Sequence, residues 1–182
     1  MNRPSFSLFD TPVGPCGLVW GGQGLVGVLL PEASAGATRS RAQRRFGGAQ
    51  EADAPPDIQR VMARIVGLLS GEPDPLQDIA LDTSGVPPFN LRVYDLARGI
   101  RPGHTLTYGE VATRLGEPHA ARAVGQALGA NPFPIIVPCH RVLAAGGKSG
   151  GFSAPGGART KLRLLEIEGA PLGAGPGLFD SV

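Results

Sequence analysis

The chain contains 182 residues with a formal net charge of +2 and two cysteines, Cys16 and Cys139. This length suits one medium domain or two small ones, and two cysteines so far apart exclude a disulfide-rich scaffold. No apolar stretch approaches the roughly 20 residues of a membrane span, and the N-terminus shows no signal-peptide pattern. We therefore expect a cytoplasmic protein without a membrane partner.

The first 85 residues predict a small α/β domain with an antiparallel sheet. Three strand-like segments joined by Gly and Pro turns predict a meander; they are residues 6–8, 18–20 and 25–30. Apolar residues recur at helical spacing between Asp57 and Gly71, an acidic start and a glycine stop. An amphipathic helix should therefore cover the sheet.

A second helix is expected over residues 34–46. Its four arginines either face solvent, which is the usual place for charges on a helix, or contact DNA; they are Arg39, Arg41, Arg44 and Arg45. Further along, Gln77, Ile79 and Leu81 alternate with a period of two. This alternation predicts a short strand before a linker at 82–88.

Two glycine-rich patterns resemble nucleotide-binding motifs but lack their context. Residues 22–27 fit the dinucleotide fingerprint, yet a strand pattern follows where a helix is required, so we interpret them as a hairpin turn. Gly147-Lys148-Ser149 lacks the first glycine of a phosphate-binding loop, because position 142 is valine. The cysteines and histidines also lack metal-ligand spacing. The sequence therefore predicts no cofactor and no metal.

Two helices are predicted directly after the linker. The first has an apolar stripe and should stop near Gly99; the stripe consists of Phe89, Val93, Leu96 and Ala97. Thr107 and Glu110 form a capping box, which opens a short second helix through Leu115.

A glycine turn at Gly116 and a third helix from Pro118 to Leu128 complete a helix-turn-helix pattern. The third helix is poor in large side chains, and Arg122 and Gln126 lie four residues apart on one face. Such a helix either packs on another helix or closely approaches another surface. Residues 86–182 carry ten Lys/Arg and six Asp/Glu, or +4. A local basic excess of this kind is required for a phosphate-binding surface.

A thiol next to an imidazole follows the most apolar run of the chain. Residues 135–137 suit a short interior strand that Pro138 ends, because proline has no N–H to donate. Cys139 attacks only as a thiolate, and His140 is the usual type of partner. Adjacent residues of an extended chain point to opposite faces, so contact requires a turn or a bridging water. The alternative is a core cysteine beside a surface histidine.

The chain resembles the O6-alkylguanine-DNA alkyltransferases, also called methylated-DNA–protein-cysteine methyltransferases. The resemblance runs from about Phe89 to Gly169 and depends on several ordered motifs. These are Tyr108-Gly109-Glu110, Ala121-Arg122-Ala123-Val124-Gly125, Asn131-Pro132, Pro138-Cys139-His140-Arg141-Val142 and Leu164-Leu165-Glu166-Ile167-Glu168-Gly169.

This resemblance implies direct-reversal DNA repair. Cys139 would accept the alkyl group from O6 of a guanine that has been rotated out of duplex DNA, and the thioether formed would end the reaction after one turnover. The implied fold is an α+β protein in which a small N-terminal α/β domain (1–85) precedes a winged-helix-like DNA-binding domain (86–169). The implied partner is double-stranded DNA that contains O6-alkylguanine, with O4-alkylthymine left open, and the protein would be a monomer.

The resemblance also implies roles for individual residues. His140 takes the proton of Cys139 through water, Glu168 orients the imidazole, and Tyr108 donates a hydrogen bond to the guanine as charge develops on it. Asn131 ties the DNA-reading helix to the active-site strand. Arg122 fills the gap left by the flipped base, and the implied DNA contacts are made by Arg122, Gln126, Tyr108, Ala121, Ser153 and Phe152.

The loop at 146–157 departs from the family pattern. Relatives have Tyr-Ser-Gly-Gly or Tyr-Ala-Gly-Gly where this chain has Phe152-Ser153-Ala154-Pro155, and about two residues are inserted before Lys161. Phe152 still offers a ring to a base, and Ser153 is the expected donor to guanine O6, while a flexible connector is the alternative. Ala154 and Pro155 narrow the expected pocket, which favours methyl over bulky adducts.

The final helix is expected over 159–167 with Leu162, Leu164 and Leu165 inward, and 170–182 should be disordered because it is rich in Gly and Pro. Two functions compete with transfer: lesion binding without chemistry, and sequence-specific regulation of transcription by a winged helix. The cysteine favours transfer, because the non-enzymatic relatives in this family lack it.

Overall fold

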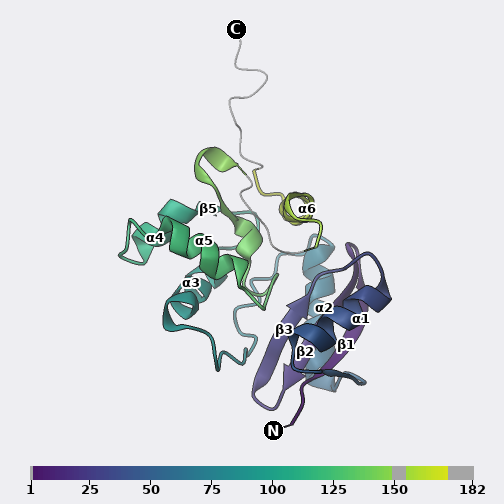
Figure 1. The fold of residues 1–182 in the computed structure, drawn as a ribbon. Coiled ribbons are helices and arrows are strands. Elements are labelled where there is room, and N and C mark those ends of the chain that lie inside the picture. The colour runs from purple at the N-terminus through teal and green to yellow at the C-terminus, as the bar shows by residue number, and fades with distance from the viewer. Residues whose placement is uncertain (1, 149–154, 172–182) are drawn as a thin grey trace.

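The computed structural model describes residues 2–148 and 155–171 (Figure 1). The first part of the chain contains β1 (Ser5–Thr11), β2 (Gly14–Gly21), β3 (Gly24–Leu29), α1 (Ala35–Arg45), β4 (Gln50–Glu51) and α2 (Pro56–Leu69). The second part contains α3 (Pro88–Arg98), β5 (Leu106–Thr107), α4 (Tyr108–Arg114), α5 (Ala121–Gly129), β6 (Val142–Leu143) and α6 (Ala158–Ile167), with two 3-10 turns, η1 (Cys139–Arg141) and η2 (Ala145–Gly147). This arrangement confirms the predicted mixed α+β class.

The predicted antiparallel meander is confirmed. The strand order is β3-β2-β1-β4, in which β1, β2 and β3 pair antiparallel and the two-residue β4 adds a parallel edge that the sequence did not indicate. The glycines of the rejected nucleotide fingerprint belong to the β2–β3 hairpin. Gly24 has a φ of +129°, and a Cβ on Gly27 would overlap the ring of Phe46. These glycines therefore serve packing and chain reversal.

Helices cover both faces of the sheet, whereas the sequence analysis assigned this role only to α2. Neighbouring residues of β2 alternate: Leu18 packs in the cluster with α2, and Val19 packs with Ala42 and Phe46 of the α1 segment. Side chains on both sides of the sheet are consequently buried. Ser34 caps α1 by accepting a hydrogen bond from the Ala37 amide at 3.1 Å. The helix predicted to begin near residue 34 is thus confirmed.

The second part of the chain packs α3, α4 and α5 around one apolar cluster. The capping box is confirmed: Thr107 Oγ1 accepts from the Glu110 amide, and Glu110 accepts from the Thr107 amide at 2.6 Å. The predicted start of the next helix at Pro118 is wrong, because α5 begins at Ala121. Pro118 lies in a turn closed by the Ala120 amide donating to Glu117 O, where its fixed φ favours the turn instead of a helix.

The predicted strand at 135–137 is also wrong. The segment folds as a compact turn in which Ile135 has a φ of +77° and the Val137 amide donates to Phe133 O at 2.8 Å. Apolar composition marked these residues correctly as buried, since Ile135 and Ile136 join the cluster under α2. Prolines at positions 132, 134 and 138 remove the amides that a ladder requires, which is why burial did not produce a strand.

Three further expectations need correction. The alternation near Leu81 yields only an isolated bridge to Leu25, not a strand. In α6 Leu162 is 39% exposed, while Lys161, Leu164 and Leu165 are buried. Ala170, placed in the disordered tail by the sequence, packs against Leu143 and Leu165. The rest of that predicted tail, from 172, lies outside the described residues, and within the described ranges no helix is long and apolar enough to cross a membrane.

Candidate active site

Cys139 lies at the start of η1, where the chain leaves the proline-rich turn. It is 7% exposed and packs in the cluster formed by α3, α4 and α5. Burial raises the pKa of its thiol, and hydrogen bonds from Asn131 and from the amides of Cys139 and His140, together with the charge of Lys161, oppose that rise. The thiol is therefore protonated at rest but surrounded by groups that stabilise its anion.

Asn131 fixes the turn that carries Cys139. Its Nδ2 donates to Val137 O, and its Oδ1 accepts from the Phe133 amide, both at 2.9 Å. The residue follows Ala130, the C-cap of α5, and 6% of its surface is exposed. One buried amide therefore holds both ends of the 133–137 turn at the end of α5.

His140, Arg141 and Glu168 form a buried ionic cluster. His140 Nε2 lies 2.8 Å from Glu168 Oε1, and Arg141 binds both carboxylate oxygens through Nε at 2.9 Å and Nη2 at 2.7 Å. Arg141 Nη1 also donates to Ile100 O at 2.6 Å. The three side chains are between 1% and 4% exposed. The cluster joins η1 to the end of α6 and leaves little freedom to the imidazole.

The protonation states of this cluster follow from burial and hydrogen bonding. Burial raises the pKa of Glu168, but hydrogen bonds from His140 and Arg141 outweigh burial and lower that pKa to about 2. Burial lowers the pKa of His140, against the opposing effect of Glu168. Nδ1 of His140 is buried and has no hydrogen-bond partner among the described residues. A neutral imidazole that donates from Nε2 to Glu168 thus leaves Nδ1 as a proton acceptor.

Lys161 is a site residue that the sequence analysis missed. It is completely buried, its Nζ donates to Val142 O at 2.6 Å, and the same atom lies 5.6 Å from the centre of the Tyr108 ring. Burial lowers the pKa of Lys161 to about 8, and the charge of a Cys139 thiolate raises it. The spacing of 161, 164, 165 and 168 on one helical face was the available signal.

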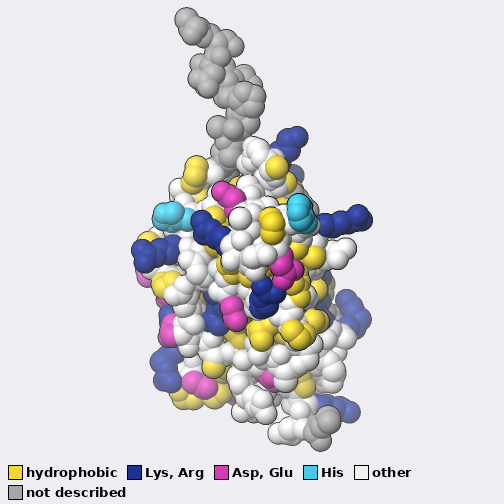
Figure 2. All heavy atoms as spheres, turned by 90° about the vertical axis from the view of Figure 1, so that its left-hand side faces the viewer, with side chains coloured by type: hydrophobic (Ala, Val, Ile, Leu, Met, Phe, Trp, Pro, Cys, Tyr) yellow, Lys and Arg dark blue, Asp and Glu magenta, His cyan; other side chains and the backbone are white. Residues whose placement is uncertain are grey.

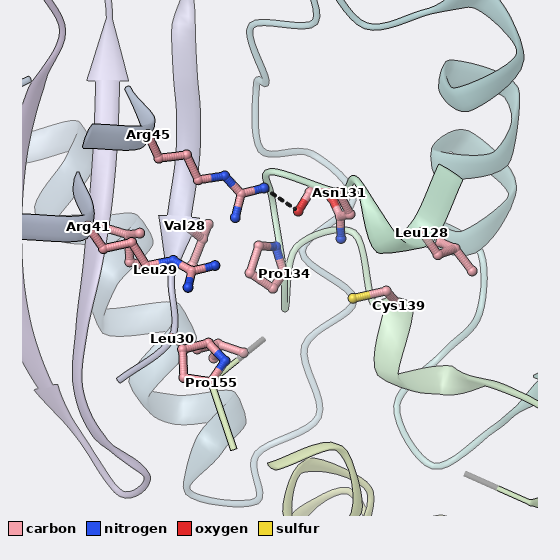
Figure 3. Close-up of a pocket in the computed structure, with 10 residues that line it drawn as sticks. All are labelled: Val28, Leu29, Leu30, Arg41, Arg45, Leu128, Asn131, Pro134, Cys139 and Pro155. Carbon is pink, nitrogen blue, oxygen red and sulfur yellow. Dashed lines mark hydrogen bonds between the residues drawn. The ribbon is translucent and has the colours of Figure 1, made fainter. Parts of the chain in front are cut away.

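Cys139 lines a pocket between the two parts of the chain (Figure 3). The pocket is small, with a cavity volume of about 20 Å³, and its lining comes from the β3 and α1 segments, from the end of α5 and from the segment around Cys139. The ten lining residues are Val28, Leu29, Leu30, Arg41, Arg45, Leu128, Asn131, Pro134, Cys139 and Pro155. Pro155, which the sequence analysis expected to narrow the pocket, is one of the lining residues.

The remaining predicted site residues lie on α4 and α5. Arg122 and Gln126 are exposed on α5, and Ala121 is partly exposed. Tyr108 begins α4, and its ring lies against α5, since a Cβ on Gly125 would be in ordinary van der Waals contact with it at 3.8 Å. Figure 2 shows the side of the molecule where α3, α4 and α5 lie, with several Lys and Arg side chains spread among apolar surface. Phe152 and Ser153 lie outside the described residues.

Comparisons with known proteins agree with this geometry. Residues 88–170 match the family model "6-O-methylguanine DNA methyltransferase, DNA binding domain". A methylated-DNA–protein-cysteine methyltransferase of Mycobacterium bovis is 36% identical over 175 residues, which cover 96% of this chain and 98% of the relative. A DNA base-flipping protein of Thermus thermophilus is 41% identical over 111 residues, or 61% of this chain and 73% of the relative.

Among solved structures, the Mycobacterium tuberculosis OGT in complex with DNA superposes with a TM-score of 0.72 at 34% identity, covering 92% of this chain and 95% of that one. The similarity therefore includes the N-terminal part, the pocket wall that it supplies and the segment around Cys139. From its sequence, its fold and its buried thiol, the chain belongs to the family of methylated-DNA–protein-cysteine methyltransferases.

Proposed function

We propose that Cys139 accepts an alkyl group from O6 of guanine in double-stranded DNA. As a member of its family the protein is a methylated-DNA–protein-cysteine methyltransferase, and direct-reversal repair fits that membership. The observation that carries the assignment is the position of Cys139: the thiol lines a pocket while hydrogen bonds and a buried cation stabilise its anion. The sulfur forms a bond to the alkyl carbon as the carbon–O6 bond breaks, and the electron pair stays on the guanine.

The thiol proton leaves through His140. The free Nδ1 of this neutral imidazole supports acceptance of the proton through a bridging water, and the Nε2 contact with Glu168 stabilises the imidazolium that forms. Arg141 holds Glu168 through two hydrogen bonds, which keeps the carboxylate charged and in place. Asn131 positions the turn and donates a hydrogen bond to the thiolate.

DNA is recognised by α5 and the start of α4. Arg122 and Gln126 are exposed and lie on one face of a helix with little other bulk, which suits entry into the minor groove and occupation of the space left by a flipped base. Ala121 permits the close approach, Tyr108 donates to the guanine, and Ser153 and Phe152 complete the contacts from the loop. The protein acts as a monomer, with residues 1–85 and 86–169 as its two domains; the family match from residue 88 supports this boundary.

Mass spectrometry tests this function directly. The protein is incubated with a duplex oligonucleotide that contains one O6-methylguanine, and the intact protein and its tryptic peptides are weighed. Transfer adds one methyl group to the peptide that contains Cys139, and it consumes protein and lesion in equal amounts. A lesion-binding protein would retain the damaged duplex without a mass change, and a transcription regulator would bind undamaged and damaged duplex equally; either result rejects the assignment.

Lys161→Met should slow methyl transfer about tenfold at neutral pH, because a shift of one unit in the pKa of the thiol changes the thiolate population by about that factor. The charge of Lys161 lowers the pKa of Cys139, so its removal raises that pKa and the rate should recover as the pH rises. Single-turnover rates between neutral and alkaline pH measure the effect. Lys148→Met, at an exposed position, is the control. A loss that is the same at every pH would contradict the electrostatic role.

A further inference from the structure

Two arginines of α1 line the same pocket as the nucleophile. Figure 3 shows the side chains of Arg41 and Arg45 reaching from α1 toward the segment that carries Pro134 and Cys139. The proposed mechanism uses neither arginine, and the sequence favoured a solvated helix face for both. Their place in the pocket wall requires a different explanation.

The two arginines differ in how their charges are balanced. Arg41 pairs with Glu32 at 2.8 Å. Arg45 donates to the backbone oxygen of Asn131 at 3.3 Å and lies 5.7 Å from the ring centre of Phe46, and it forms no ion pair in the part of the chain that the structure describes. Arg45 thus brings an unneutralised positive charge to the pocket.

The surroundings of Arg45 favour the binding of an anion by its guanidinium. Arg45 is exposed to solvent, and partial desolvation on its pocket side lowers the pKa of its guanidinium, as does the charge of Arg41. Apart from Arg41, Asn131 and the Cys139 thiol, the other lining residues are apolar, and none of the ten is acidic. A site with this lining favours an anion over a neutral group of the same shape.

We propose that Arg45 recognises a negatively charged substituent on guanine O6, such as a carboxyalkyl group, and that the protein transfers such groups as well as methyl. The inference rests on the proposed function, since the acceptor is again Cys139. The thiolate sulfur bonds to the methylene carbon next to O6, the carbon–O6 bond breaks, and guanine keeps the electron pair and takes a proton. The product is S-carboxyalkylcysteine, whose carboxylate remains beside Arg45, and no further reactant is required.

Three duplexes that differ only in the O6 substituent test the proposal: carboxymethyl, carbamoylmethyl and methyl. Carbamoylmethyl has the shape of carboxymethyl without its charge, so the ratio of their single-turnover rates isolates the contribution of the charge. The wild-type protein should transfer carboxymethyl faster than carbamoylmethyl. Arg45→Met should lower this ratio about tenfold and Arg45→Lys should keep part of it. Arg44→Met, an exposed neighbour on the same helix that does not line the pocket, should leave the ratio unchanged.

Each other outcome has a distinct meaning. If Arg45 contacted a DNA phosphate, Arg45→Met would slow all three duplexes by the same factor and the ratio would not change, which overturns the inference. A wild-type ratio of one or less also overturns it. The methyl duplex keeps these results separate from the proposed function: absence of methyl transfer to Cys139 rejects the function itself, whereas methyl transfer with an unchanged ratio rejects only the role of Arg45.

Discussion

Cys139→Ser should abolish alkyl transfer, with a loss of at least about 10³-fold in the single-turnover rate, because a serine hydroxyl is a far weaker nucleophile than a thiolate at neutral pH. The groups around Cys139 stabilise a sulfur anion, and burial alone would otherwise suppress it. The exchange alters one atom, so folding and DNA binding should persist. Intact mass after incubation with an O6-methylguanine duplex, together with the affinity for that duplex, measures both properties.

Cys16→Ala is the matched control, since Cys16 is also buried and free. Burial raises the pKa of Cys16 to about 11, against the weaker effect of a contact with Thr11. It packs in the cluster under α2, so alanine should cost about 1 kcal/mol of stability and leave transfer intact. A methyl group found on Cys16, or full transfer by Cys139→Ser, would refute the choice of acceptor.

Glu168→Gln should have the second largest effect, on stability and rate together. Glutamine leaves Arg141 with an uncompensated charge in a site where both side chains are at most 4% exposed, which should cost about 3 kcal/mol of unfolding free energy. The imidazolium of His140 also loses its partner, so we expect a transfer rate lower by about 10²-fold. Denaturant unfolding and single-turnover kinetics, at a temperature where the variant is folded, separate the two effects.

The pH dependence of stability distinguishes this role from simple packing. The pKa of Glu168 is about 2 in the folded protein against an ordinary value of 4.5, so its contribution to stability is complete above about pH 5 and is lost as the pH falls toward 2. The difference in unfolding free energy between wild type and Glu168→Gln should therefore shrink below pH 5. Glu166→Gln removes only an exposed pair with Arg163 at 3.8 Å and should change neither quantity. A constant difference down to pH 3 would contradict the ionic role.

Local signals in the sequence were sufficient for most helices and for the meander. The capping box at Thr107 and the glycine after α4 depend on neighbouring residues only, and the structure confirms both. The strand predicted at 135–137 failed because its apolar character reports burial, whereas its shape depends on prolines and on the hydrogen bonds of Asn131. Hydrogen bonds that a side chain makes across a turn leave no periodic pattern in the sequence, so they could not be predicted from it.

The site was predicted less completely than the fold. Resemblance identified His140 and Glu168, which the structure places 2.8 Å apart, although their roles in transfer remain proposals. It did not indicate Lys161, because a lysine on a helix is expected in solvent unless a burial pattern is sought around it. Arg45 is exposed, as the sequence analysis expected, but it also lines the pocket, which the sequence did not indicate. Its position in the pocket depends on how α1 packs on the sheet, and that is a tertiary property.

The wall opposite Cys139 consists of residues from β3 and α1, whereas the proposed DNA-reading residues lie on α4 and α5. Under the proposed function, the choice of adduct and the contact with DNA therefore depend on separate segments of the chain. Substitutions in the β3 and α1 segments should then change which lesions are accepted while the DNA-contacting residues of α4 and α5 stay the same. A lineage exposed to a new alkylating agent therefore has a short evolutionary route to a new specificity.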